Sequence, residues 1–121
     1  MISRYTRPEM GRVWSEENRS QKWLDVELAA AETLAEAGVV PAAAAAKLRE
    51  RARVDVARIN EIEAKVRHDV IAFTIAVQES VADPEAARWL HYGLTSNDVV
   101  DTAQALLVRE ASHLIEKKIE A

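Results

Sequence analysis

The clearest indication of fold class is given by residues 97–121, which read NDVVDTAQALLVREASHLIEKKIEA. Apolar residues recur three and four apart along this segment, a spacing typical of the buried stripe of an α-helix: Val99, Val100, Ala103, Leu106, Leu107, Leu114, Ile115 and Ile119. No Gly, Pro or Asn follows Asn97. The spacing therefore predicts one helix about 36 Å long, at 1.5 Å per residue. Because this stripe is long and its end carries no stop signal, we expect the sequence to be cut inside an element, so that the functional protein is longer or an oligomer.

Upstream of this helix, the sequence predicts further helices and no sheet. Gly and Pro occur only three times each, and no period-2 run of useful length is present. Ser15, Asp55 and Asp69 are expected to cap helices, Asp83-Pro84-Glu85 to start a short one, and Gly38 to end one. The fold class is therefore predicted to be all-α, with a helical domain at 1–96 and the truncated first part of a long helix at 97–121. Within the domain we expect an extended arm at 1–7 and helices at about 15–37, 41–51, 55–66, 69–81 and 84–90.

Two further packing expectations come from composition. The alanine run at 42–46 predicts a surface helix that buries little, since alanine favours helix but offers small side chains. Trp23 falls in an apolar helix stripe and is expected in the core. Core packing is also the favoured interpretation for Trp14 and Trp89.

Composition excludes several classes of function. The chain has 121 residues, 49% of them hydrophobic and 30% charged, with a net charge of −4, which argues against nucleic-acid binding driven by overall charge. It has no cysteine, which excludes disulfides, thiolate zinc sites and a Cys nucleophile. The three histidines lack the spacing of a metal pair, so no metal is expected. Neither a membrane span nor a signal peptide is apparent, which favours a cytoplasmic location.

Polar residues that could carry chemistry gather in three places. Arg4-Tyr5 offers a guanidinium for phosphate and a ring, although a mobile basic arm is the alternative. Arg67-His68-Asp69 places a cation, an imidazole and a carboxylate at a predicted helix break. The alternative there is that Asp69 only caps the helix while His68 packs.

The third place is the polar turn from His91 to Asp98, which reads HYGLTSND. Ser96 or Asn97 is expected to cap the last helix. The hydroxyls of Thr95 and Ser96, together with helix-start amides, form a natural pocket for a carboxylate or phosphate. The alternative is a capped turn with a buried His91.

Taken together, these segments resemble the N-terminal part of the adenylosuccinate lyase family, within the aspartase/fumarase superfamily. The similarity covers essentially the whole chain and rests on the order and joint occurrence of its motifs. They are Arg4-Tyr5-x-x-Pro8-Glu9-Met10, Trp14-Ser15-Glu16-Glu17-Asn18-Arg19, Lys22-Trp23-Leu24-x-Val26-Glu27, Gly38-Val39-Val40-Pro41, Ile62-Glu63, Arg67-His68-Asp69-Val70-Ile71-Ala72-Phe73 and His91-Tyr92-Gly93-Leu94-Thr95-Ser96-Asn97-Asp98-Val99-Val100-Asp101-Thr102-Ala103.

The resemblance implies an enzyme that cleaves adenylosuccinate to AMP and fumarate, and that acts likewise on the succinyl-carboxamide ribonucleotide of purine synthesis. In this β-elimination a base removes a proton next to a carboxylate and an acid protonates the departing nitrogen. The resemblance implies no cofactor. It also implies a homotetramer built on a bundle of long helices, whose active sites each take residues from three subunits.

The resemblance also implies roles for individual residues. Arg4 and Tyr5 contact the nucleotide, and Thr95 and Ser96 hold a substrate carboxylate. His68 lies near the leaving nitrogen and the dicarboxylate. The substrate-binding residues implied are Arg4, Tyr5, Arg67, His68, Asp69, His91, Thr95 and Ser96. The main catalytic acid and base of the family have no counterpart in these residues, so the chain alone is expected to be inactive.

Two other interpretations remain open. A helical interaction domain would use the amphipathic last helix to oligomerise without catalysis. A carboxymuconate cycloisomerase of the same superfamily looks similar around Thr95-Ser96. That group has a tryptophan where this chain has Tyr92, and it lacks the Arg-His-Asp segment.

Overall fold

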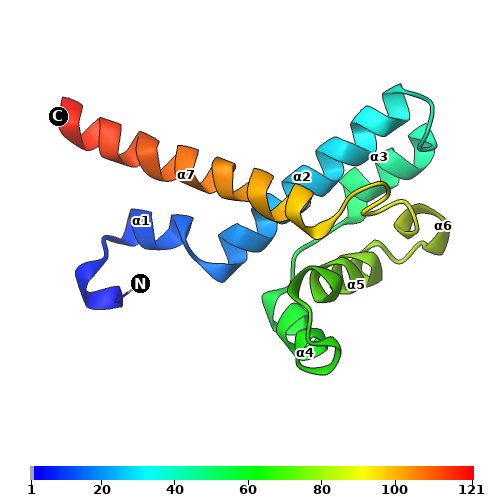
Figure 1. The fold of residues 1–121 in the computed structure, drawn as a ribbon, viewed down its shortest axis with the longest axis horizontal. Coiled ribbons are helices and arrows are strands. Elements are labelled where there is room, and N and C mark those ends of the chain that lie inside the picture. The colour runs from blue at the N-terminus through cyan, green and yellow to red at the C-terminus, as the bar shows by residue number, and fades with distance from the viewer. Residues whose placement is uncertain (1) are drawn as a thin grey trace.

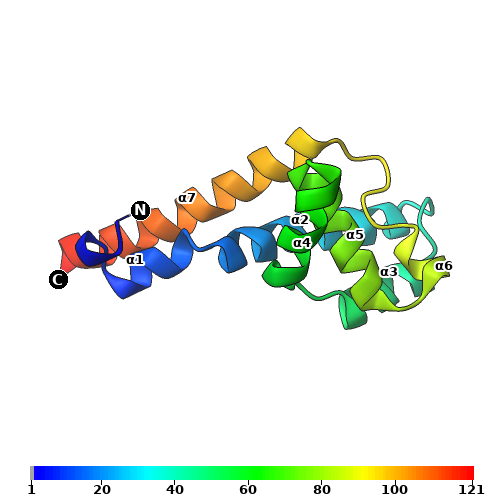
Figure 2. The same ribbon diagram turned by 90° about the horizontal axis from the view of Figure 1, so that it is seen from below.

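The computed structural model describes residues 2–121, and every regular element within them is a helix (Figures 1 and 2). The all-α fold class predicted from the sequence is therefore confirmed. The elements in chain order are η1 (Ser3–Tyr5), α1 (Pro8–Val13), α2 (Glu16–Glu36), α3 (Ala42–Arg51), α4 (Val56–Val66), α5 (Asp69–Val81), α6 (Pro84–Ala87) and α7 (Ser96–Glu120).

Several helix ends lie where local sequence predicts them. The side chains of Ser15, Asp55 and Asp83 accept backbone N–H groups at the starts of α2, α4 and α6. Such acceptors satisfy amide groups that have no partner inside the helix. Gly38, with φ of +78°, turns the chain out of α2 in a left-handed conformation that costs glycine little.

Two predicted caps are wrong by one residue or more. His68 caps α5 in place of Asp69, and Thr95 begins α7 in place of Ser96 or Asn97. A cap residue must have extended backbone. His68 (φ −150°, ψ 121°) and Thr95 (φ −106°, ψ 168°) meet this requirement, whereas Asp69 and Ser96 are already helical.

Two predicted ranges also differ from the structure. Within the arm, the described residues include the short helix η1, closed by the Thr6 hydroxyl donating to the carbonyl of Ile2 at 2.7 Å. The helix expected at 84–90 ends at Ala87, because the chain then turns and takes left-handed backbone angles at His91 and Gly93.

The main core forms where α2, α3, α4, α5 and α6 meet the first half of α7. Trp23 is buried and packs edge-on against Phe73, with ring centroids 5.5 Å apart. The expectation for the alanine run holds for Ala42, Ala43 and Ala46, which are exposed. It fails for Ala44 and Ala45, which are buried and whose small side chains let α3 pack closely on α2. The core packing favoured for Trp14 is also wrong, since 38% of this residue is exposed.

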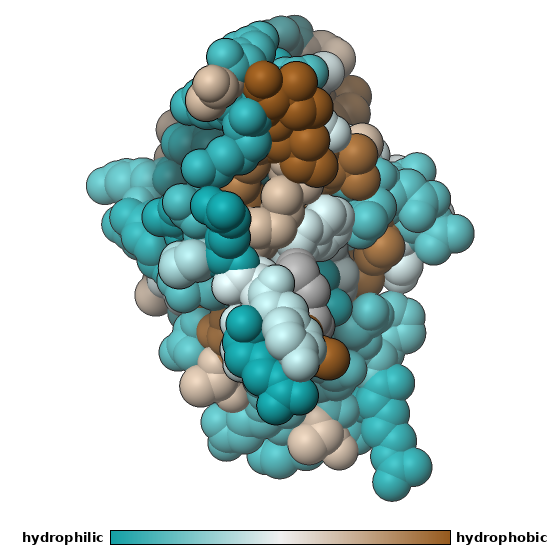
Figure 3. Space-filling view, turned by 90° about the vertical axis from the view of Figure 1, so that its left-hand side faces the viewer, coloured by the Kyte–Doolittle hydropathy of each residue, from teal (hydrophilic) through white to brown (hydrophobic). Residues whose placement is uncertain are grey.

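The second half of α7 extends away from this core, with α1 beside it (Figures 1 and 2). A small second cluster joins Val13 of α1 to Leu107 and Ala111 of α7. Beyond it Ile115 and Ile119 are 52% and 78% exposed, and Figure 3 shows hydrophobic surface at this end of the molecule. No helix within residues 2–121 combines the length and the apolar character needed to cross a bilayer.

Candidate functional site

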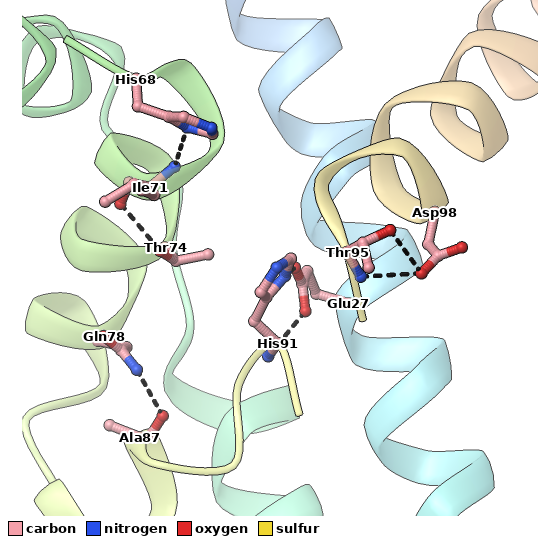
Figure 4. Close-up of polar contacts among 9 residues, drawn as sticks. All are labelled: Glu27, His68, Ile71, Thr74, Gln78, Ala87, His91, Thr95 and Asp98. Atoms are coloured by element: carbon pink, nitrogen blue, oxygen red, sulfur yellow. Dashed lines mark hydrogen bonds and ion pairs between the residues drawn. The ribbon is translucent and has the colours of Figure 1, made fainter. Parts of the chain in front are cut away.

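The start of α5 carries the first group of candidate residues. Arg67 ends α4 in the left-handed conformation, with φ of +54°, and its exposed side chain forms no ion pair within residues 2–121. Nδ1 of His68 accepts the backbone N–H of Ile71 at 3.2 Å (Figure 4). Asp69 is exposed beside it in the first turn of α5. The break between α4 and α5 therefore presents a cation, an imidazole and a carboxylate together.

The helix cap determines where His68 carries its proton. An imidazole nitrogen that accepts an N–H cannot itself be protonated, so the proton of the neutral ring lies on Nε2. Nδ1 lies 3.7 Å from the Asp69 carboxylate, but an ion pair there would require a proton on Nδ1 and would break the cap. With the cap formed, His68 offers an Nε2–H donor from a side chain that is 42% exposed.

The second group centres on His91, in the turn between α6 and α7. The amide of Gln78 on α5 donates to the carbonyl of Ala87 at 3.0 Å and ties the start of this turn to the core. His91 donates its backbone N–H to Oε2 of Glu27 at 2.9 Å, and its Nδ1 lies 2.5 Å from Oε1 of the same carboxyl group. His91 is therefore held at two points by one side chain of α2 (Figure 4).

Glu27 is a residue that sequence reasoning missed as part of the site. It is 1% exposed, and burial raises the pKa of its carboxyl group even though the hydrogen bonds and charge of His91 act in the other direction. The available signal was a charged residue on the apolar face of α2, four residues after Trp23 and four before Ala31. Its partner lies sixty-four residues away in sequence, so spacing could not identify it.

The third group lies at the start of α7. Oδ2 of Asp98 accepts the backbone N–H of Thr95 at 2.8 Å and its hydroxyl at 3.1 Å. These hydrogen bonds, led by the backbone one, lower the pKa of Asp98, and the nearby His91 acts in the same direction. The hydroxyl of Thr95 is thus already engaged in capping, while Ser96 occupies the first position of the helix. A substrate group that takes the Thr95 hydroxyl would have to displace Asp98 from it.

The structure brings some candidate residues together and separates others. His91, Thr95 and Asp98 share one turn, whereas no hydrogen bond or ion pair within residues 2–121 joins His68 to that group. Arg4 and Tyr5 lie at the opposite end of the elongated molecule, close to the end of α7 (Figures 1 and 2). Both are exposed, and the guanidinium lies 4.9 Å from the centroid of the Tyr5 ring. One copy of this chain therefore does not form a single pocket from all eight residues.

The candidate residues can bind a ligand through polar groups. Among residues 2–121, no group of three or more His, Asp or Glu side chains is arranged to hold a metal ion. The helix starts of α5 and α7 provide amide groups and a favourable dipole for anions, and the two histidines add ring nitrogens. This arrangement fits an anionic ligand with several oxygen atoms.

This chain is similar to proteins of a known family. The family described as "Lyase" matches residues 3–121. Adenylosuccinate lyases from Bacillus subtilis (strain 168), Streptococcus mutans and Staphylococcus saprophyticus are 52%, 51% and 48% identical to this chain over 120 residues. Each match covers 99% of this chain but only 27% of the relative, so the chain spans about a quarter of those proteins' length.

Two solved structures share the fold. A 3-carboxy-cis,cis-muconate lactonizing enzyme from Pseudomonas putida is 35% identical, with a TM-score of 0.83 over 93% of this chain and 27% of that one. A fumarate lyase from Mesorhizobium sp. BNC1 matches with a TM-score of 0.81 over 92% of this chain and 26% of that one. At 24% identity the second structure supports the fold alone.

Proposed function

This chain belongs to the lyase family, and from that premise we propose that it is part of an adenylosuccinate lyase. The whole protein would cleave adenylosuccinate to AMP and fumarate, and would split the succinyl-carboxamide ribonucleotide of purine synthesis in the same way. The observation that carries the proposal is that about half of all residues are identical to curated adenylosuccinate lyases over nearly the full chain.

The polar groups described above suit a β-elimination. When a proton leaves the carbon next to a carboxylate, negative charge develops on that carboxylate and needs donors already in place. The start of α7 at Thr95 and Ser96 would supply them. His68, whose cap leaves Nε2–H free, would act as a donor near the leaving nitrogen or the dicarboxylate, with Arg67 and Asp69 as neighbours. No cofactor takes part in this proposal.

Assembly is part of the same proposal. Arg4 and Tyr5 would bind the nucleotide in a site completed by another subunit of a cytoplasmic homotetramer, since they lie far from His68 and Thr95 within one chain. Two features support the association of further protein with α7. They are the exposed Ile115 and Ile119, and an apolar groove between α2 and α7 lined in part by Val26, Ala30, Leu34, Leu94 and Leu106.

A second candidate function is lactonization of a carboxymuconate, which the 35% identical lactonizing enzyme supports. The adenylosuccinate lyases are more similar over the same part of the chain, so we rank the cycloisomerase second. A non-catalytic helical interaction domain gives no reason for the polar groups gathered at the starts of α5 and α7, so it ranks third.

The deciding experiment uses the full-length protein that carries this chain. With adenylosuccinate as substrate, we expect AMP and fumarate in equal amounts. AMP should also protect the protein against heat, by about 2.7 kcal/mol at a hundredfold excess over Kd. The 121 residues alone should release no fumarate. Absence of fumarate together with a lactone formed from 3-carboxy-cis,cis-muconate would establish the second candidate instead, and absence of any turnover or AMP protection would favour the interaction domain.

A further inference from the structure

His91 has a backbone conformation that is uncommon for residues other than glycine. Its φ of +64° lies in the left-handed region, which is unfavourable for residues other than glycine. The sequence nevertheless places histidine there, with Gly93 two residues later. A residue other than glycine keeps such a conformation only where surrounding contacts hold it there.

Those contacts come from Glu27. The carboxyl group is 1% exposed and lies on the core side of α2. It accepts the backbone N–H of His91 with one oxygen and faces Nδ1 with the other. Burying a carboxylate is unfavourable unless hydrogen bonds compensate it, and both of its oxygens have such a partner here. The pair thus orders the backbone and the ring of His91 together.

The opposite edge of the His91 ring, which carries Nε2, is available to bind a ligand. The side chain of His91 is 27% exposed, and Nε2 has no hydrogen-bond partner within residues 2–121. No buried side-chain nitrogen or oxygen in that part of the chain lacks a partner, so Nε2 must reach the surface. The charged group that approaches His91 from the α7 side is Asp98, whose own carboxylate is engaged by Thr95.

We propose that Glu27 is the positioning residue of His91. It receives the Nδ1 proton and the backbone N–H, fixes the plane of the ring, and thereby presents Nε2 to the substrate. The inference rests on the proposed function in one respect, namely that His91 lines the substrate site. Glu27 itself touches no substrate and acts only through His91.

The sharpest variant is Glu27→Gln, which keeps the shape of the side chain. Its carbonyl oxygen can still accept the backbone N–H of His91, but its NH2 group can only donate to Nδ1. The ring proton therefore moves to Nε2, and the nitrogen that faces the substrate changes from acceptor to donor. In the full-length enzyme we expect kcat/KM to fall roughly 10- to 100-fold, the range measured for partners that orient metal-binding histidines.

A double-mutant cycle separates positioning from general support of the fold. If Glu27 acts through His91, adding Glu27→Gln to His91→Ala changes kcat/KM by less than about twofold. Independent losses that multiply in the double variant would overturn the proposal. Glu110→Gln is the matched control, because Glu110 is also a carboxylate that connects two elements, but it lies on α7 and pairs with Lys22 and Asn18 of α2. It should leave kcat/KM within about twofold of the wild type.

A spectroscopic measurement keeps the test independent of turnover. In full-length protein with 15N-labelled histidine, signals that disappear in His91→Gln belong to His91. We expect Nδ1 to carry the proton near neutral pH, and Nε2 to carry it in Glu27→Gln. A wild-type ring protonated on Nε2 alone would overturn the proposal. If the wild type cleaved no adenylosuccinate, the proposed function would fail while this measurement still decided the Glu27–His91 pair.

Discussion

At the scale of single residues, left-handed backbone conformations recur in the candidate site. Within residues 2–121, three residues other than glycine have positive φ angles, namely Arg67, Ala82 and His91. Two of them belong to the candidate site. Arg67 and Ala82 occupy equivalent positions, since each ends one helix and is followed closely by the capped start of the next. This equivalence makes Ala82 a control for Arg67.

We predict that Arg67→Gly and Ala82→Gly stabilise the protein to a similar extent. Glycine removes the left-handed strain, which is partly offset by greater freedom in the unfolded chain, so the net gain should be about 0.5–1 kcal/mol for each. Denaturant unfolding of the full-length variants measures it. Only Arg67→Gly should lower kcat/KM for adenylosuccinate. Equal activities of the two variants would remove Arg67 from the site.

His68 combines a helix cap with a free Nε2–H, and two variants separate these roles. We predict that His68→Ala costs about 0.5–1 kcal/mol because the N–H of Ile71 loses its acceptor, whereas His68→Asn keeps the stability because asparagine is a strong cap. Thermal unfolding measures this difference. Both variants should lose most turnover while the oligomer stays intact. If His68→Asn were fully active, the ring would have no role beyond capping.

At the scale of elements, one amide connects three helices. Nδ2 of Asn18 on α2 donates to the carbonyl of Val13 at the end of α1, at 2.9 Å, and to Oε2 of Glu110 on α7, at 3.0 Å. Glu110 also accepts a hydrogen bond from Nζ of Lys22 at 2.5 Å. This hydrogen bond is the largest cause of the lowered pKa of Glu110. The network lies where α7 leaves the main core, so it sets the direction of the second half of α7.

We therefore predict that Asn18→Ala costs about 1–2 kcal/mol, as expected for two partly buried hydrogen bonds. The effect should be local. Hydrogen exchange should speed up in α1 and in α7 beyond Leu107, while α4 and α5 stay protected. Gln21→Ala is the control, because the one side-chain hydrogen bond of Gln21 within residues 2–121 is to Asp25 on its own helix. Its cost should stay within about 0.5 kcal/mol. Equal exchange rates in both variants would contradict the role of Asn18.

Local sequence predicted the elements better than it predicted the site. Apolar spacing and the caps Ser15, Asp55 and Asp83 depend on neighbours within one turn, so the positions of the helices could be inferred. The choice between His68 and Asp69 as the cap depends on one backbone angle, which two adjacent polar residues leave undetermined. The pairing of Glu27 with His91 depends on how α2 packs against a distant turn, which no local pattern contains.

At the scale of the whole molecule, the carboxyl groups whose pKa is shifted divide into two classes with opposite effects on stability. In the first class, a hydrogen bond is the largest cause of a lowered carboxyl pKa. A basic side chain donates it to Glu32, Glu79, Asp83 and Glu110, and the backbone N–H of Thr95 donates it to Asp98. Burial raises the pKa of Glu27 instead. A lowered pKa means that the folded state binds the proton less tightly than the unfolded state. The first class therefore stabilises the protein above the ordinary values of 3.8 and 4.5, and this contribution is lost as pH falls.

Glu27 should affect the pH dependence of stability with the opposite sign, because burial raises its pKa. Below its ordinary pKa of 4.5 the carboxyl group is protonated in both states and costs nothing extra. As pH rises above 4.5, the unfolded state releases the proton first, so stability falls until the folded group ionises as well. Glutamine cannot ionise. The Tm of Glu27→Gln minus that of the wild type should therefore become more positive as pH rises from 4 through 4.5 and beyond, whatever its starting value.

Glu79→Gln is the control, because it removes a carboxyl group whose pKa is lowered by its hydrogen bond with Arg58. For this variant, the Tm difference from the wild type should become more negative on the same rise in pH. Scanning calorimetry of the three proteins at matched ionic strength measures both trends, and parallel curves for the two variants would show that burial does not control Glu27.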